Sequence, residues 1–340
     1  MQAMDNYSQI LSFRNLLSAA RKTMRGKKRS VGACKFHFYL EPELFRLQQE
    51  LIAETYHPGD FEFFQIRDPK SRRICVAPFR DRVLHHAICN ILEPILEKSM
   101  ISNSFACRRG KGTLAAIEYV HSLCSSPGYF LKCDISRYFD SIDHEILANR
   151  LARRISDPRL MQLLRRIIQT VLPHCDAGKG IPIGNLTSQH FANFYLSPLD
   201  HFIQRTLKIK GYCRYMDDFL LFSDDKSTLR VAEIEIRQFL MSRLNLSLKE
   251  RALVLAPVSE GVPFIGFRFF PAVIRLQKGL LKRWRRKLTQ RFKAFEAGSL
   301  SEEEYLCSVS SLMGFMKHAH SLRLRQSLYH GFLDWGHEAG

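Results

Sequence analysis

Two adjacent carboxylates, those of Asp217 and Asp218, stand between two apolar runs of the sequence. The flanking residues favour β-strands, so we expect the pair at the tight turn of a hairpin. Carboxylates held this close repel each other unless a cation lies between them, and Mg²⁺ prefers such hard oxygen ligands. An ordinary polar turn is the alternative, because aspartate is common in turns.

A third carboxylate, Asp134, ends the short apolar run that begins at Tyr129. This pattern predicts a strand that brings Asp134 next to the hairpin. Three carboxylates from two chain segments can hold two Mg²⁺ ions. Two ions about 4 Å apart can activate a hydroxyl and stabilise an in-line phosphoryl transfer. Asp134 could instead cap a turn, but the presence of Asp217 and Asp218 favours catalysis.

The segments around Asp134 and Asp217 resemble motifs A and C of the reverse transcriptases, in the order in which that family carries them. Residues 180–196 lie between them and resemble motif B. Most reverse transcriptases have Gln-Gly and then Ser-Pro in motif B, whereas this chain has Ile183-Gly184 and Ser188-Gln189. That departure resembles the reverse transcriptases of diversity-generating retroelements. The resemblance runs from about residue 10 to the C-terminus.

The resemblance implies a right-hand polymerase of the α+β class, with an antiparallel palm sheet and helices. It assigns residues 1–125 to N-terminal helices and fingers, 126–270 to a palm with motifs A to E, and 271–340 to a short helical thumb. We expect no RNase H or endonuclease domain. The implied reaction is error-prone, RNA-directed DNA synthesis by two-metal phosphoryl transfer. Its template would be a template-repeat RNA, and its outcome mutagenic retrohoming directed at adenines.

The resemblance also implies a cofactor and partners. Two Mg²⁺ ions, for which Mn²⁺ can substitute, would be held by Asp134, Asp217, Asp218 and the backbone carbonyl of Ile135. The partners would be dNTPs, the template RNA, its RNA/DNA duplex and a small basic accessory variability protein that forms a pentamer. A reverse transcriptase of a phage-defence or CRISPR-associated system is an alternative with the same chemistry. A catalytically silent RNA-binding scaffold is another, disfavoured by the three carboxylates.

Residues at the incoming nucleotide follow from the same resemblance. Arg73 matches a basic residue that holds the triphosphate, and its planar fork suits phosphate. Phe139, five residues after Asp134, would clash with a 2′-hydroxyl and so favour dNTPs. Lys249 matches a motif D lysine that can protonate pyrophosphate, or it is a simple surface lysine. The full predicted set is Arg73, Phe139, Ile183, Gly184, Gln189 and Lys249.

Ile183 bears on fidelity. Related enzymes carry there a glutamine that reaches the sugar and base of the incoming nucleotide, whereas isoleucine can neither donate nor accept a hydrogen bond. Losing a polar contact worth roughly 1–3 kcal/mol would relax selection by about tenfold to a hundredfold.

The chain has 51 lysines and arginines against 33 aspartates and glutamates, which gives a formal net charge of +18. Such a charge suits nucleic acid or an anionic membrane. No apolar run approaches the roughly 18 residues that span a bilayer, and the N-terminus has no signal-peptide layout. We therefore expect a cytoplasmic protein that binds nucleic acid and no membrane.

Three basic segments are predicted to contact nucleic acid. The cluster of residues 21–29 is the first, with a solvated charged face as the alternative. The second resembles a motif that precedes the palm in intron-type enzymes, and it offers Arg108 and Lys111. The third is the acid-free stretch 271–295, whose basic helix face would grip the minor groove of the duplex. Its predicted contacts are Lys282, Arg283, Arg285 and Arg286.

Periodicity and turn residues predict further elements. We expect a helix over residues 36–60 and hairpins over 61–79 and 264–269, the last resembling a primer grip. Thr113 and Ser227 are candidate N-caps. The nine cysteines never form a Cys-x-x-Cys pair, so we expect neither a zinc cluster nor a disulfide framework.

Overall fold

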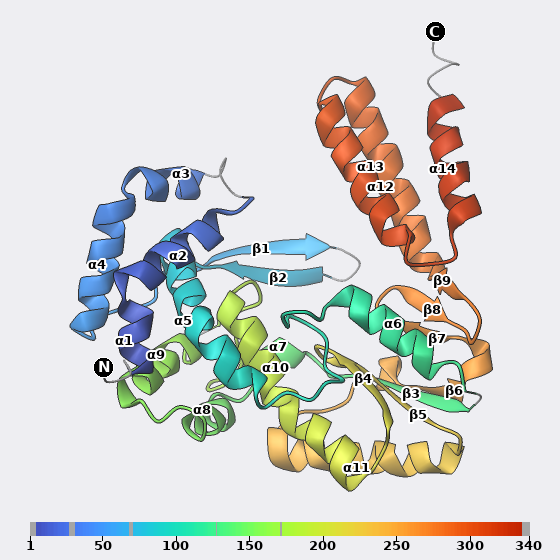
Figure 1. The fold of residues 1–340 in the computed structure, drawn as a ribbon, viewed down its shortest axis with the longest axis horizontal. Coiled ribbons are helices and arrows are strands. Elements are labelled where there is room, and N and C mark those ends of the chain that lie inside the picture. The colour runs from blue at the N-terminus through green and yellow to red at the C-terminus, as the bar shows by residue number, and fades with distance from the viewer. Residues whose placement is uncertain (1–4, 27–30, 68–70, 127, 171, 335–340) are drawn as a thin grey trace.

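A computed structural model describes residues 5–26, 31–67, 71–126, 128–170 and 172–334 of the chain. An N-terminal unit of helices precedes a palm built around an antiparallel sheet, and three C-terminal helices rise from the far side of the palm (Figure 1). A two-stranded hairpin of the N-terminal unit points towards those C-terminal helices (Figure 1).

The N-terminal unit comprises α1 (Asn6–Leu11), α2 (Phe13–Met24), α3 (Val31–Phe38), α4 (Leu40–Ile52), β1 (Glu62–Arg67), β2 (Ser71–Val76) and α5 (Phe79–Glu97). The next elements are α6 (Thr113–Leu123), β3 (Tyr129–Asp134), α7 (Tyr138–Ser141), α8 (His144–Ala152), α9 (Pro158–Ile168), α10 (Leu186–His201) and the π-helix η1 (Phe202–Thr206). The chain continues with β4 (Gly211–Tyr215), β5 (Asp218–Ser223), α11 (Lys226–Leu244), η2 (Glu250–Ala252), β6 (Val254–Pro257) and η3 (Val258–Glu260). The remaining elements are β7 (Val262–Phe264), β8 (Phe267–Phe269), β9 (Ile274–Leu276), α12 (Lys278–Glu296), α13 (Glu302–Met316) and α14 (Leu322–Asp334).

The palm sheet has four antiparallel strands in the order β4-β5-β3-β6. Because side chains alternate between the faces of a sheet, each strand contributes to two cores. Leu131 and Phe219 belong to the core shared with α10 and α11, whereas Phe130 and Leu220 pack with α6 and the β7-β8-β9 sheet. Both faces are therefore covered, and a charged side chain within these strands must be paired.

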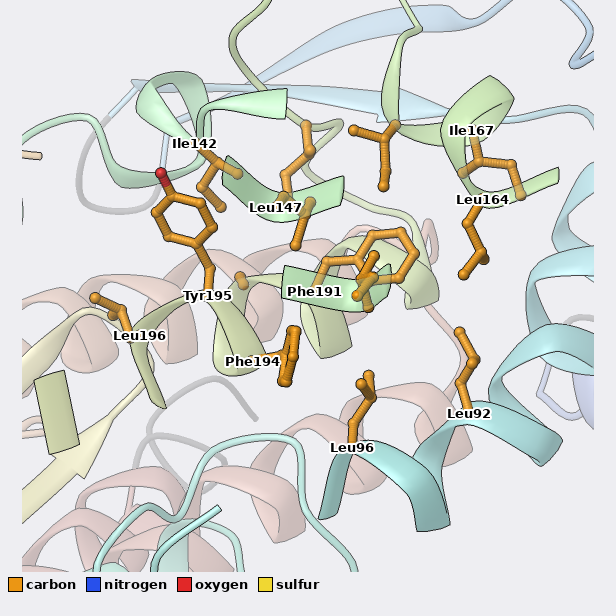
Figure 2. Close-up of a cluster of buried hydrophobic side chains, with 14 of the residues drawn as sticks. Leu92, Leu96, Ile142, Leu147, Leu164, Ile167, Phe191, Phe194, Tyr195 and Leu196 are labelled. Atoms are coloured by element: carbon orange, nitrogen blue, oxygen red, sulfur yellow. The ribbon is translucent and has the colours of Figure 1, made fainter. Parts of the chain in front are cut away.

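One continuous core joins the N-terminal unit to the palm. Leu92 and Leu96 of α5 lie in the same cluster as Phe191 and Phe194 of α10, with side chains of α8 and α9 on the other side of α10 (Figure 2). Burial of such side chains stabilises the folded chain by about 1.5–3 kcal/mol each. Helix α5, which follows the hairpin β1–β2 in the chain, is thus packed against α10 of the palm.

Arg214 of β4 is a charged side chain that the covered sheet buries completely. Its guanidinium donates to both carboxylate oxygens of Asp200 on α10, at 2.7 and 2.6 Å. The hydroxyl of Tyr212 donates to the same carboxylate at 2.7 Å. Further guanidinium bonds reach the side chain of Asn193 and the carbonyl of Met216. This network joins α10, β4 and the turn that follows β4.

The predicted helix over residues 36–60 is wrong in two respects. Two helices, α3 and α4, meet at Tyr39, and the second ends at Ile52. Pro42 accounts for the break, because inside a continuous helix its ring would clash with the carbonyl of Phe38, whereas the first turn of α4 tolerates it. After α4, Glu54 adopts a left-handed conformation with φ of 56°, which ends the helical run.

Both candidate N-caps are also wrong. Gly112 precedes α6 at the N-cap position, and the Thr113 hydroxyl lies 2.9 Å from the Tyr215 hydroxyl instead. Asp225 caps α11, because its carboxylate accepts the backbone amide of Ser227. A carboxylate two residues earlier thus takes the role expected of the serine.

The two predicted hairpins are confirmed. Strands β1 and β2 pair from Glu62 opposite Val76 to Arg67 opposite Ser71, and the turn between them lies outside the described residues. Strands β7 and β8 form the second hairpin, and β9 adds a third strand beyond residue 270, so the first helix of the C-terminal group begins only at Lys278. Within the described ranges, no helix is long and apolar enough to cross a membrane.

Replacing Asp200 with alanine should lower the free energy of unfolding by about 3–5 kcal/mol, because it leaves the buried Arg214 guanidinium without its counter-charge. The matched control is Glu145→Ala, which removes the exposed partner of Arg165 and should cost less than about 1 kcal/mol. Chemical denaturation of both variants measures the difference. Equal, small losses would show that the buried pair is not a main support of the palm.

Candidate active site

The structure brings the three predicted carboxylates to one end of the palm sheet. Asp134 is the last residue of β3 and Asp218 the first of β5, and the two face each other directly across antiparallel strands. Residues opposed in this way have adjacent side chains. Asp217 lies in the two-residue turn that links β4 to β5. The strand and the hairpin expected from the sequence are both confirmed.

The turn that carries Asp217 has an unusual backbone. Its first residue, Met216, has φ of 61°, a left-handed conformation that is uncommon for a non-glycine residue and costs free energy. The buried Arg214 guanidinium donates to the carbonyl of Met216 at 2.9 Å. The same arginine that anchors β4 to α10 therefore stabilises the conformation that sets the position of Asp217.

Two lysines border the carboxylates. The ammonium group of Lys132 donates to Oδ2 of Asp218 at 3.1 Å, and that of Lys249 lies 3.6 Å from Oδ2 of Asp134. The backbone amide of Lys249 also donates to the carbonyl of Asp134 at 2.8 Å. Lys249, which sequence reasoning divided between a catalytic and a surface role, is thus fixed beside the carboxylates.

Burial and repulsion from neighbouring carboxylates favour protonation of Asp217 and Asp218. Burial raises the pKa of Asp218 to about 7, and Lys132 opposes this shift. Burial, followed by repulsion from Asp134, raises the pKa of Asp217 to about 6, and the positive charge of Arg72 opposes it. Perturbation of this kind is typical of functional sites.

The donor set fits divalent cations. Oδ1 of Asp218 is buried and accepts no hydrogen bond from the part of the chain that the structure describes. A buried oxygen without a donor is unfavourable, and a cation would satisfy it while relieving the repulsion between neighbouring carboxylates. Asp134, Asp217 and Asp218 are the residues that would hold such ions. Ile135 buries its side chain in the core directly after Asp134, so its contribution would be its backbone carbonyl.

Strand β2 carries the arginine predicted at the triphosphate. Arg73 is exposed and pairs with Gln65 of β1. Its neighbour Arg72 points to the opposite face of the hairpin, and it is the positive charge of Arg72 that opposes the raised pKa of Asp217. Sequence reasoning missed Arg72, although the strict alternation of a strand allows only one of two adjacent residues to face the carboxylates.

The motif B loop docks against β2. The amide of Cys75 donates to the carbonyl of Ile183 at 2.8 Å. Gly184 has φ of 126°, and a Cβ atom there would lie 2.5 Å from the carbonyl oxygen of Cys75. Only glycine fits so close an approach. The Ile183-Gly184 dipeptide therefore joins the hairpin of the N-terminal unit to the palm.

Two further predicted nucleotide residues lie on helices of the palm. Phe139 of α7 is half-buried, packs edge-on against Tyr138 and accepts the amide of Ile181 at its carbonyl. Gln189 of α10 is also half-buried, and its side-chain carbonyl lies 3.5 Å from the thiol of Cys107.

Arg108 and Lys111, which were predicted to contact nucleic acid, both have partners within the protein. Arg108 is 7% exposed, forms an ion pair with Glu97 and donates to the carbonyls of Ile101 and Ser104. Lys111 donates to the carbonyl of Ser102 at 2.8 Å and covers the ring of Phe105. Both cations are used to hold the loop before α6.

The predicted thumb contacts lie on α12. Lys282, Arg285 and Arg286 are exposed and Arg283 is half-exposed, while Trp284 and Leu288 are buried. The helix thus has one apolar face packed on its neighbours and a basic remainder. Of the basic cluster 21–29, residues 21–26 end α2 and follow it, and residues 27–29 lie outside the described ranges.

Sequence reasoning missed Arg214, Asp200 and Lys132. A signal for Arg214 was present, since it is a lone charge within the apolar strand Gly211–Tyr215, but its partner on α10 could not be read from local pattern.

Without divalent ions, Asp217 and Asp218 keep their protons to a higher pH in the folded than in the unfolded state. Between about pH 4 and about pH 7 the folded chain binds more protons, so these residues should lower the free energy of unfolding as pH rises, by roughly 3–7 kcal/mol. Urea unfolding in a chelator at several pH values, compared with the Asp217→Asn/Asp218→Asn double variant, isolates this contribution. The pH slopes should differ in that window, and identical slopes would contradict the pKa shifts.

Comparison with known proteins agrees with this geometry. The family model described as Reverse transcriptase (RNA-dependent DNA polymerase) matches residues 66–269, more than half of the chain. Protein YkfC of Escherichia coli is 28% identical over 306 residues, covering 74% of this chain and 79% of that protein. The putative COX1/OXI3 intron 1 protein of Saccharomyces cerevisiae is 24% identical over 168 residues, 47% of this chain and 20% of that protein. Nuclear intron maturase 1 of Arabidopsis thaliana is 30% identical over 86 residues, 25% of this chain and 12% of that protein.

Solved structures give the same fold. The apo telomerase of Candida tropicalis aligns with a TM-score of 0.51 and 11% identity, over 79% of this chain and 58% of that one. The apo telomerase of Candida tropicalis truncated from its C-terminal domain aligns with a TM-score of 0.50 and 13% sequence identity, over 64% of this chain and 55% of that one. This chain therefore spans less than two thirds of either telomerase, and the likeness is one of fold, the right-hand polymerase fold. The chain belongs to the reverse transcriptase family and is an RNA-directed DNA polymerase.

Proposed function

We propose that this RNA-directed DNA polymerase is the error-prone enzyme of a diversity-generating retroelement. It copies a template-repeat RNA into cDNA with errors directed at adenines, and this cDNA supports mutagenic retrohoming. The observation that supports this proposal most directly is the apolar side chain of Ile183 in motif B. The backbone of Ile183 is fixed by the amide of Cys75 at 2.8 Å, and its half-buried side chain offers no hydrogen bond where most reverse transcriptases carry a glutamine.

The carboxylates Asp134, Asp217 and Asp218, with the backbone carbonyl of Ile135, hold two divalent ions in this proposal, and Mg²⁺ fits such oxygen ligands. Such ions, when bound, would activate the primer hydroxyl and neutralise charge on the leaving pyrophosphate. The ammonium group of Lys249, 3.6 Å from Oδ2 of Asp134, would donate a proton to that pyrophosphate. On β2, Arg72 is the arginine whose charge reaches Asp217, and it holds the triphosphate by charge-assisted hydrogen bonds, whereas Arg73, the arginine predicted for this role, lies on the opposite face of the strand.

Phe139 selects the sugar. Its ring lies on α7, directly after the strand that delivers Asp134, and packing against Tyr138 limits its movement. A rigid aromatic ring under the sugar excludes a 2′-hydroxyl, so dNTPs are the substrates. Gly184 and Gln189 complete the pocket on the side of motif B.

The nucleic-acid partners are the template RNA and the RNA/DNA duplex. The basic residues Lys282, Arg283, Arg285 and Arg286 of α12 contact the duplex backbone, where positive charge supplies most of the affinity. A small basic accessory variability protein that forms a pentamer is the protein partner implied by the retroelement assignment.

Asp217→Asn should reduce primer extension by at least about a thousandfold, because it removes a carboxylate from the ion site, whose contribution is several kcal/mol. RNA binding should persist, since it rests on basic surfaces. Asp224→Asn is the matched control, an exposed carboxylate just beyond the other end of β5. Extension by Asp217→Asn at the rate of that control would remove the carboxylates from catalysis.

Ile183→Gln should lower misincorporation opposite template adenines, by up to about tenfold, because one restored hydrogen bond is worth roughly 1 kcal/mol. Errors opposite the other bases should change less. Ile183→Leu keeps the side chain apolar and should retain the original spectrum. Sequencing of cDNA made by all three proteins on one RNA gives the comparison, and three indistinguishable adenine error rates would exclude Ile183 from the mechanism.

A further inference from the structure

A second group of potential metal ligands lies outside the catalytic carboxylates. Asp140 of α7, His174 and Cys175 each offer one donor atom, and these atoms lie within 4.8 Å of one another. Nε2 of His174 is 3.5 Å from Oδ1 of Asp140. This group could not be predicted from the sequence, because Asp140 is distant from the His174-Cys175 dipeptide along the chain and no cysteine pair is involved.

The donor types and their spacing suit Zn²⁺. Zinc binds Cys sulfur at about 2.3 Å and His nitrogen or carboxylate oxygen at about 2.0–2.2 Å, so a tetrahedral site separates its ligand atoms by roughly 3.3–3.7 Å. The contact between His174 and Asp140 falls within that range. The cluster needs only a small contraction to surround one ion. An imidazole, a thiolate and a carboxylate also favour zinc over Mg²⁺, which takes oxygen ligands.

The backbone already holds the cluster together. His174 and Cys175 lie on a strap, residues 172–181, that leads from α9 into motif B. The strap is tied to the segment around α7 by the amide of Gly180 on the carbonyl of Ile142, at 2.8 Å, and by the amide of Ile181 on the carbonyl of Phe139, at 2.9 Å. A metal joining Asp140 to the strap would reinforce a contact that exists.

The thiol of Cys175 lies close to the backbone of Gly180, further along the strap. A Cβ atom at Gly180 would lie 2.5 Å from its sulfur, so this position allows only glycine beside the thiol. Burial and then the Asp140 carboxylate raise the pKa of Cys175 to about 11. The same carboxylate that repels a bare thiolate would share a divalent cation with it, and the two negative charges would balance the ion.

A fourth position is available. The cluster lines a pocket of about 270 Å³ whose wall also includes Arg137, Asp176 and Lys179. Nδ1 of His174 is buried without a hydrogen-bond partner among the residues described. The pocket has room for a water molecule as fourth ligand, as zinc sites with three protein ligands commonly have.

We propose that Asp140, His174 and Cys175 form a zinc site separate from the catalytic carboxylates. The ion fastens the strap of residues 172–181 to α7. Because α7 carries Phe139 and the strap leads to Ile183-Gly184, zinc binding restrains both sides of the proposed nucleotide pocket while taking no part in phosphoryl transfer.

Cobalt(II) provides the test, because it occupies zinc sites and gives a thiolate-to-metal charge-transfer absorption when cysteine is a ligand. The full chain, freed of metal by a chelator, should bind one Co²⁺ with this absorption, and Zn²⁺ should displace it. Cys175→Ser should abolish the absorption, and His174→Ala should weaken Co²⁺ binding at least about tenfold. Zn²⁺ should raise the melting temperature of the parent protein and not that of Cys175→Ser.

Two controls separate this site from others. Cys307→Ser removes an exposed thiol of α13 and should keep the absorption, and Asp217→Asn should keep it although it disables the proposed catalytic site. Absence of a thiolate band in the parent protein, or its persistence in Cys175→Ser, would overturn the zinc site. Neither result depends on whether the enzyme copies RNA, so failure here is distinct from failure of the proposed function.

Discussion

The buried ion pair between Arg214 and Asp200 is the contact on which the candidate active site depends. It joins a helix to a strand where both are fully covered, and removing one partner would leave a charge without solvent or counter-ion. The same guanidinium also stabilises the turn after β4, because it donates a hydrogen bond to the carbonyl of Met216. The Arg214 side chain therefore contributes both to the stability of the palm and to the position of Asp217.

The candidate active site itself is electrostatically unfavourable without cations. Asp217 and Asp218 have raised pKa values because burial and neighbouring carboxylates disfavour their charge, and one buried oxygen of Asp218 has no donor among the described residues. Lys132 and Lys249 offset part of this cost at the edges of the cluster. A rigid palm can keep carboxylates in such an arrangement, and relief of their repulsion would favour the binding of divalent ions.

Local pattern predicted the strand that ends at Asp134, the hairpin around Asp217 and the pairing of β1 with β2, because each follows from a short apolar run and its turn. Features that depend on distant partners were not predictable. The ion pair between Arg108 and Glu97 results from tertiary packing, so it could not be predicted from the sequence around Arg108. The grouping of Asp140 with His174 and Cys175 also results from tertiary packing. Arg72 and Arg73 lie on opposite faces of β2, and their identical charge does not indicate which of the two faces the carboxylates.

We propose that this polymerase makes DNA on RNA with errors concentrated at adenines. Extension of a DNA primer on one defined RNA, with balanced dNTPs and with every product sequenced, measures it most directly. We predict cDNA whose substitutions fall mainly opposite template adenines. Faithful copying of adenines, or errors spread evenly over the four bases, would contradict the retroelement assignment.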